Sequence, residues 1–154
     1  MAATLTDAEH LAIRLALEDL NADFTYYLDH GHVDALVELF CEDAKYSHGS
    51  RHSDGRAEIA ALFRERARAA RTSRHIYSGL RLAIASATEA SGTSVCLTFA
   101  ADGPPPHPAT PLLVADFDDR YVLCPDGRWR FLERHIRRIF VDPANPGPVR
   151  LARP

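Results

Sequence analysis

The sequence predicts an α+β fold, because helical patterns come first along the chain and long strand patterns follow. Apolar residues recur at three- and four-residue spacing before Ser73 and at two-residue spacing from there onward. Turn-forming residues separate the strand patterns, so neighbouring strands are expected to be joined by hairpins. Together these features predict a curved, mixed or antiparallel sheet with the helices packed on one of its faces.

Length and composition indicate a single compact domain. The chain has 154 residues, of which 46% are hydrophobic and 25% charged, enough apolar material for one buried core. The net charge of −3 and the isoelectric point near 6.2 argue against a nucleic-acid-binding protein, which typically carries a basic excess.

The cysteines and the N-terminus bear on the cellular compartment. Cys41, Cys96 and Cys124 lack metal-binding spacing, and their odd number argues against a disulfide framework. No basic segment followed by an apolar core stands near the N-terminus, and no apolar run approaches membrane-spanning length. We therefore expect a soluble, cytoplasmic protein without a membrane partner.

The first helix is expected to begin after Thr6 and to end near Gly31. Thr6 and Glu9 form a capping-box pattern, in which each side chain accepts a hydrogen bond from a free backbone N–H. One apolar stripe follows at helical spacing: Ile13, Leu17, Leu20, Phe24 and Leu28. Asp29 comes directly after this stripe.

A short helix, a strand and a third helix follow. Residues 33–40 predict the short amphipathic helix, and residues 44–49 alternate as a strand with Tyr46 and His48 on one face. The segment SRHSDG is interpreted as a polar loop before a helix at about residues 56–70. Four arginines are interpreted as its solvated face, with attraction of anions as the alternative: Arg64, Arg66, Arg68 and Arg71.

The second half of the chain predicts long strands, at about residues 73–85, 92–101, 111–124 and 127–141. Their connections are residues 89–92, the proline-rich segment GPPPHPATP and the turn at residues 125–127. We expect one domain over residues 1–141 and an irregular tail over residues 142–154. The tail and the proline-rich segment either cover an opening or lie as surface loops.

Asp29 is the first candidate functional residue. The macrodipole disfavours a carboxylate at the C-terminal end of an apolar helix, so its position suggests a use. The alternative is that Asp29 only helps to end the helix before Gly31.

The order of the expected elements resembles a known family. Four segments carry the resemblance: YYLDHGHVDALVELFCEDAKY, DGRAEIAALF, TSRHIYSGLRL and DFDDRYVLCPDGRWRFLERHIRRIF. They are similar to the SnoaL-like and scytalone-dehydratase-like proteins of the nuclear transport factor 2-like superfamily, over about residues 5–141. The resemblance implies a cone-shaped α+β barrel, a curved mixed sheet with three N-terminal helices on its concave side.

The resemblance also implies catalytic residues. Scytalone dehydratase and hexachlorocyclohexane dehydrochlorinase use an aspartate ending the first helix and a histidine early on the strand after the third helix. By position these match Asp29 and His75. The dehydrochlorinase stabilises negative charge with an arginine five residues after a tryptophan, and Arg134 stands five residues after Trp129.

These three residue types can abstract a proton from carbon. Neutral imidazole is a base whose pKa lies near physiological pH, and a buried aspartate orients it and stabilises the imidazolium that forms. A guanidinium stabilises the departing anion or an enolate oxygen in a dry site. The alternatives are a structural, partly buried His75 and an Arg134 that forms a solvent-facing salt bridge, because strand alternation leaves its face undecided.

Five further residues are candidate substrate contacts: Tyr27, Tyr46, His48, Phe24 and Tyr77. The resemblance places the strand of Tyr46 and His48 on the inner wall of the cone, whereas aromatic residues at these spacings are more often part of a core. Phe24 replaces a lysine of the dehydrochlorinase, and the tyrosines and second histidine of the dehydratase are not all matched. We therefore expect neither known substrate. No metal ligand set is expected, since the histidines of residues 30–52 lack metal-binding spacing.

The resulting hypothesis is a cofactor-independent lyase or isomerase, dehydratase- or cyclase-like, acting on a small, mostly apolar, cyclic or polyketide-like molecule. A homodimer or homotrimer is expected. Two alternatives stay open: a non-catalytic small subunit of an aromatic-ring-hydroxylating dioxygenase, and a small-ligand-binding module. The first would expose an apolar sheet face, and the second would hold its histidine away from any carboxylate.

Overall fold

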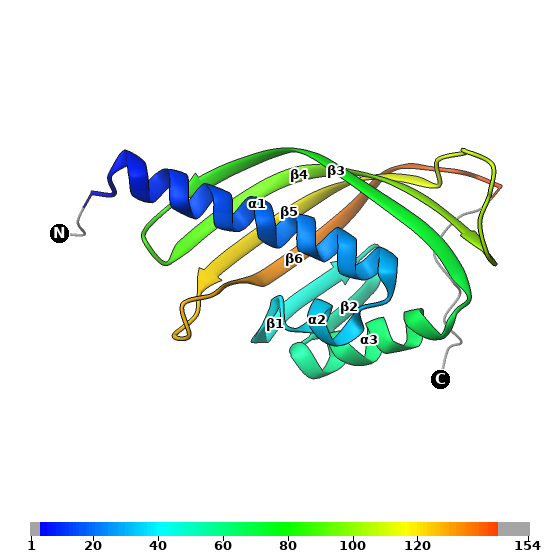
Figure 1. The fold of residues 1–154 in the computed structure, drawn as a ribbon, viewed down its shortest axis with the longest axis horizontal. Coiled ribbons are helices and arrows are strands. Elements are labelled where there is room, and N and C mark those ends of the chain that lie inside the picture. The colour runs from blue at the N-terminus through cyan, green and yellow to red at the C-terminus, as the bar shows by residue number, and fades with distance from the viewer. Residues whose placement is uncertain (1–3, 145–154) are drawn as a thin grey trace.

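The structure is a computed structural model that describes residues 4–144. Helices and strands follow one another in the order α1, α2, β1, β2, α3 and β3–β6 (Figure 1). Their bounds are α1 Asp7–His30, α2 Val33–Val37, β1 Phe40–His48, β2 Arg51–Asp54, α3 Arg56–Arg68, β3 Arg71–Ile84, β4 Glu89–Asp102, β5 Leu113–Leu123 and β6 Trp129–Val141.

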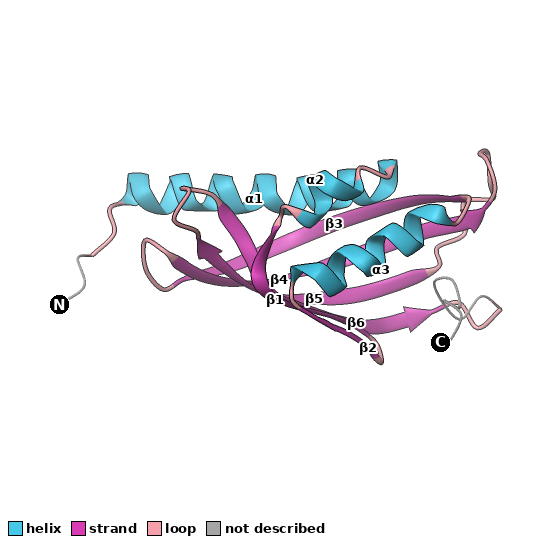
Figure 2. Ribbon diagram, turned by 90° about the horizontal axis from the view of Figure 1, so that it is seen from below, coloured by secondary structure: helices cyan, strands magenta, loops and turns pink. Residues whose placement is uncertain are grey.

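The strands form one curved sheet in the order β2-β1-β6-β5-β4-β3. Strands β1 and β6 are parallel, and the other neighbours are antiparallel. The predicted α+β fold with a mixed sheet is confirmed, and the helices pack on the concave side (Figures 1 and 2). The sheet stays open, with β2 and β3 at its edges, so the cone is incomplete.

Helix α1 has the predicted ends. The Thr6 hydroxyl accepts a hydrogen bond from the Glu9 backbone, and the Glu9 carboxylate accepts one from Thr6 N–H, which completes the capping box. Gly31 ends the helix with φ 72°, in the left-handed region that glycine adopts without steric cost.

An aromatic cluster fills the space between α1 and the sheet. Phe24 lies at its centre, with its ring 5.8–6.4 Å from the rings of four other phenylalanines in edge-to-face arrangement, contributed by β1, α3, β5 and β6: Phe40, Phe63, Phe117 and Phe131. The helical stripe and the alternation of the strands therefore meet in one core.

Several element boundaries were predicted wrongly. Residues 51–54, expected to be a loop, form β2, which pairs with β1. Strand β1 begins at Phe40, where a helical residue was expected, because Phe40 pairs with Phe131 of β6. A pairing between residues so far apart in the sequence gives no local pattern of apolar residues from which the start of the strand could be predicted. Strand β4 begins at Glu89, so the β3–β4 turn lies at residues 85–88.

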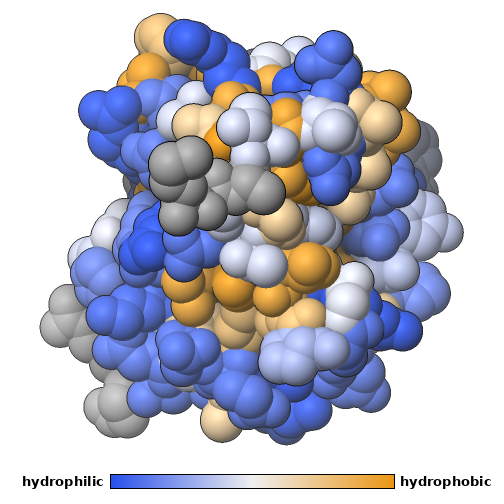
Figure 3. All heavy atoms as spheres, turned by 90° about the vertical axis from the view of Figure 1, so that its left-hand side faces the viewer, coloured by the Kyte–Doolittle hydropathy of each residue, from blue (hydrophilic) through white to orange (hydrophobic). Residues whose placement is uncertain are grey.

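The end of the molecule that carries the N-terminus of α1 combines polar and apolar side chains. In this view an apolar patch crosses the middle of the face with hydrophilic residues beside and below it, and further apolar areas lie near the top (Figure 3). None of the helices within residues 4–144 is both long enough and apolar enough to span a bilayer. Residues 145–154 of the expected tail lie outside the described residues, and the predicted division into domain and tail stays a prediction.

Candidate active site

The end of α1 directs Asp29 toward the sheet. Gly31 N–H and His32 N–H both donate to the Tyr27 carbonyl, so the chain turns sharply after His30. Asp29 is in the last helical turn, and its side chain contacts the first residues of β3, which run past this end of the helix. Only 5% of the Asp29 side chain is exposed.

His75 is the main partner of Asp29. Its ring Nδ1 lies 2.6 Å from Asp29 Oδ1, and its backbone N–H donates to Asp29 Oδ2 at 2.8 Å. Because an ionised carboxylate only accepts hydrogen bonds, this contact assigns the proton to Nδ1 and leaves Nε2 as the free basic nitrogen. Within the described residues, His75 Nε2 makes no hydrogen bond.

The carboxylate of Asp29 is held in its charged form. Burial alone would raise its pKa, but the hydrogen bonds from the His75 ring and backbone and from Ser73 outweigh this effect. The pKa of Asp29 is therefore below its ordinary value. An ionised Asp29 is suited to orient the His75 ring and to stabilise an imidazolium that forms on it.

Ser73 and Arg66 extend this pair, and both were missed by the sequence analysis. The Ser73 hydroxyl donates to Asp29 Oδ1 at 2.8 Å and accepts from Arg66 Nη2 at 3.2 Å. The prediction of a solvated arginine face is wrong for Arg66, which also donates to the Leu28 carbonyl. Helical spacing could have shown this, since Arg66 continues the buried line of Ile59 and Phe63.

Arg134 lies in the core, where 1% of its side chain is exposed. The alternative of a solvent-facing salt bridge is therefore wrong. Its guanidinium forms a two-point contact with Asp119, with Nε and Nη2 each 2.8 Å from a carboxylate oxygen. Nη2 also donates to Asn21 Oδ1 of α1. Asp119 in turn accepts from the Tyr121 hydroxyl.

The remaining guanidinium nitrogen is unused. Arg134 Nη1 is buried and has no hydrogen-bond partner among the described residues. The guanidinium carbon lies 4.0–4.6 Å from the ring centres of Phe24, Phe117 and Phe131, so cation–π contacts compensate part of its desolvation. An unpaired charged donor in an aromatic surrounding is suited to bind developing negative charge.

Tyr46 and His48 lie on the same side of β1, as expected. Burial raises the pKa of Tyr46 to about 12, so its hydroxyl stays protonated at neutral pH. Burial and then the charge of Arg138 lower the pKa of His48 to about 4, and Arg138 Nε lies 3.3 Å from His48 Nε2. His48 is therefore neutral at physiological pH, and a smaller electrostatic contribution to its lowered pKa comes from His75.

The other candidate contacts have separate surroundings. Phe24, 1% exposed, belongs to the aromatic core. The Tyr77 hydroxyl donates to the Glu18 carboxylate and carbonyl on α1. Tyr27 lines a cavity at the end of α1. The structure thus brings Asp29 and His75 together and places Arg134 deeper in the core, beside Phe24.

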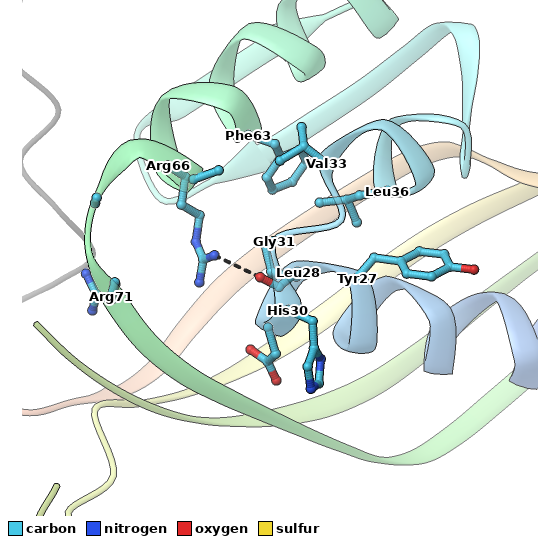
Figure 4. Close-up of a pocket in the computed structure, with 12 residues that line it drawn as sticks. Tyr27, Leu28, His30, Gly31, Val33, Leu36, Phe63, Arg66 and Arg71 are labelled. Atoms are coloured by element: carbon cyan, nitrogen blue, oxygen red, sulfur yellow. Dashed lines mark hydrogen bonds between the residues drawn. The ribbon is translucent and has the colours of Figure 1, made fainter. Parts of the chain in front are cut away.

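A cavity of about 220 Å³ opens beside Asp29, between the end of α1, α2, α3 and the start of β3 (Figure 4). Tyr27 and Asp29 are the only predicted site residues among those that line it within the described residues. Arg66 and Arg71 line it as well. Arg71, predicted to lie on the arginine face of the third helix, begins β3 instead.

Comparison with solved structures supports the fold. The chain is 26% identical to a candidate scytalone dehydratase from Novosphingobium aromaticivorans, with 97% of each chain covered and a TM-score of 0.81. LinA, a hexachlorocyclohexane dehydrochlorinase, is 23% identical, with coverages of 97% and 100% and a TM-score of 0.75. A candidate aromatic ring hydroxylase from N. aromaticivorans is 16% identical, with coverages of 87% and 96% and a TM-score of 0.73.

The similarities to LinA and to the candidate ring hydroxylase, at 23% and 16% identity, show the fold alone. Comparison with curated proteins gives no match. A model of the SnoaL-like domain matches residues 9–135, which is most of the chain, and the protein therefore belongs to the SnoaL-like domain family.

Proposed function

We propose that this protein is a cofactor-independent lyase or isomerase that removes a proton from carbon in a small, mostly apolar, cyclic substrate. The observation that carries the proposal is the 2.6 Å contact between His75 Nδ1 and the buried Asp29 carboxylate. Dehydratase- and dehydrochlorinase-type structures share the fold and support a lyase-like role.

His75 is the base. Its Nε2 takes the proton, and the positive charge that forms on the ring is stabilised by Asp29 through the Nδ1–H hydrogen bond. Loss of a leaving group from the neighbouring carbon completes an elimination. Return of the proton to another carbon of the substrate completes an isomerisation instead.

Arg134, Tyr46 and His48 are the candidate groups that stabilise or position the substrate, although none of them lines the cavity beside Asp29. The unpaired Nη1 of Arg134 is the candidate donor to a departing anion or an enolate oxygen. Tyr46 keeps its proton and is suited to donate a hydrogen bond to a carbonyl. His48, neutral at physiological pH because of its lowered pKa, positions the substrate as a hydrogen-bonding group without a charge.

The test is proton exchange at carbon. Cyclic ketones and hydroxylated or halogenated cyclic compounds are incubated with the protein in D₂O, and NMR follows deuterium incorporation and release of the leaving group. His75→Ala is expected to lower the rate by about 100-fold or more, the usual contribution of general-base catalysis. The exposed His52→Ala is the control and should react like the wild type.

A second measurement does not need a substrate. In ¹⁵N-labelled protein at mildly alkaline pH, His75 should show a proton on Nδ1 and none on Nε2, and Asp29→Asn should alter that signal. A wild-type rate in a folded His75→Ala variant, or an Nε2–H tautomer in the wild type, would contradict the assignment of His75 as the base.

A non-catalytic small subunit of a ring-hydroxylating dioxygenase is the second candidate. The outer sheet face carries apolar side chains that are 56%, 45% and 68% exposed at Ile76, Val95 and Phe140, and the candidate ring hydroxylase shares the fold. Such a subunit should co-purify with a larger iron-bearing partner. Our proposal instead expects the purified chain to form a homodimer or homotrimer alone, which sedimentation measures.

An unreactive ligand-binding module is less well supported. It would hold its histidine beyond hydrogen-bond distance of any carboxylate, whereas His75 and Asp29 are in contact.

A further inference from the structure

The cavity at the end of α1 has one apolar and one cationic side. Val33, Leu36 and Phe63 lie on one side, and Arg66 and Arg71 lie on the other (Figure 4). With a volume of about 220 Å³, it is smaller than the sites that enclose drug-sized molecules, which are roughly 300 Å³ or more. It therefore suits a ligand of about one ring.

Two guanidinium groups, those of Arg66 and Arg71, and one carboxylate, that of Asp29, line the cavity within the described residues. Arg66 donates only to neutral acceptors, the Leu28 carbonyl and the Ser73 hydroxyl. Arg71 makes no side-chain hydrogen bond or ion pair within the described part of the chain; Asp102, its neighbour across β3 and β4, acts on it only from beyond 4.0 Å. The carboxylate of Asp29 is already bound to His75 and Ser73.

Burial supports the same conclusion. It lowers the pKa of both Arg66 and Arg71, which means that their surroundings disfavour the charged guanidinium. Arginine remains protonated at physiological pH. Asp29 and Asp102 act on these two guanidinium groups only through their charges, and neither forms an ion pair with them within the described residues. A partly buried guanidinium without an ion pair is stabilised by an anion from outside the chain, and guanidinium matches a carboxylate at two points.

We propose that this cavity binds a small single-ring carboxylate, with the carboxylate against Arg66 and Arg71 and the ring against Val33, Leu36 and Phe63. The inference goes beyond the proposed lyase activity and does not depend on it, because binding requires no proton transfer. It identifies an acidic small molecule as the ligand of a cavity that Asp29 lines and His75 does not.

The test uses two probes of nearly equal shape, benzoate and neutral benzamide, with affinities measured by NMR titration or calorimetry. Benzoate is expected to bind in the millimolar range or more tightly, and benzamide about tenfold more weakly or not at all. The amide signals of Gly31 and Arg71 should shift in the benzoate titration, which locates the ligand.

Arg71→Gln is the decisive variant, because it removes a guanidinium that makes no hydrogen bond within the described chain. It should weaken benzoate binding by roughly tenfold to a hundredfold, as expected for the loss of a charged hydrogen-bond donor. Arg68→Gln is the matched control: it removes the same charge from an exposed position on α3 outside the cavity lining. It should change the affinity by less than about twofold.

Three results would overturn the proposal. These are equal binding of benzoate and benzamide, equal losses in Arg71→Gln and Arg68→Gln, and no benzoate binding at millimolar concentration. Inorganic phosphate binding as tightly as benzoate would overturn the role of the apolar wall. His75→Ala should bind benzoate like the wild type, so failure of this inference and failure of the proposed catalytic role are distinguishable.

Discussion

At Arg134 the chain places a guanidinium in the middle of its aromatic core. Such a charge is costly to bury, and Asp119, whose side chain is fully buried, compensates it in a two-point contact. Asn21 and Tyr121 satisfy further polar atoms of this network. The one atom left over is Nη1, so the network holds the guanidinium rigidly while it leaves a donor free.

Breaking this pair should destabilise the protein strongly. Asp119→Asn leaves Arg134 as an uncompensated buried charge, so the free energy of unfolding should fall by about 3–5 kcal/mol. The matched control is Asp116→Asn, which breaks a pair with Arg137 on the same two strands but on the exposed face. That change should cost about 1 kcal/mol or less. Urea unfolding measures both, and equal losses would refute the argument.

The sequence contains a residue-level signal for part of this network. Alternation along β5 places Phe117, Asp119 and Tyr121 on the inner face, and a carboxylate between two aromatic residues on a buried face signals a charged partner. Alternation along β6 could not decide which face of the sheet Arg134 lies on. The pairing of β5 with β6 shifts its register between Arg120 and Tyr121, and the two ends of β6 therefore follow different patterns of buried and exposed residues.

Among the elements, α1 carries Asp29 of the candidate site, and its two ends have different roles. The capping box at Thr6 stabilises the helix far from the site, whereas Gly31 stops it where Asp29 meets β3. Long periodic elements such as α1 were predicted well. The four-residue β2 was not, because an edge strand this short and polar has no alternation that distinguishes it from a loop.

Substitutions at the two helix ends should separate stability from site geometry. Thr6→Ala removes the cap and should cost about 1 kcal/mol of unfolding free energy. Gly31→Ala should cost about 1–2 kcal/mol, because alanine disfavours the φ of 72° although an added Cβ meets no atom within 4 Å. Only Gly31→Ala should shift the His75 Nδ1–H signal in NMR. A shift of equal size in Thr6→Ala would contradict this role of Gly31.

Across the whole molecule, the candidate site depends on contacts between distant segments. Asp29 lies in the last turn of α1, Ser73 and His75 lie near the start of β3, and Arg66 comes from α3. Spacing in the sequence predicted α1, α3 and β3 as separate elements, but it did not predict that their residues meet. The pairing of Asp29 with His75 was expected only from the family resemblance. The cavity and the Ser73–Arg66 contact stayed unpredicted, because they depend on how the helix ends pack.

The stability of the whole fold should depend on pH through the partly buried His48. Burial, and then the charges of Arg138, His75, Arg51 and Arg66, lower its folded-state pKa from 6.5 to about 4. Between these values the unfolded chain binds the proton and the folded protein does not, so stability is full above pH 6.5 and falls as the pH drops toward 4. The loss should reach about 3 kcal/mol at most.

His48→Gln should flatten this decline, because glutamine has no proton to bind. Asp29 contributes in a different window: its lowered pKa means that its stabilisation is lost only below its ordinary value of 3.8. Urea unfolding of the wild type, His48→Gln and the exposed-site control His52→Gln at several pH values from 4 to 7 stays above the Asp29 window and therefore isolates the contribution of His48. If the wild type and His48→Gln lose stability in parallel over this range, His48 does not titrate as a buried group beside Arg138.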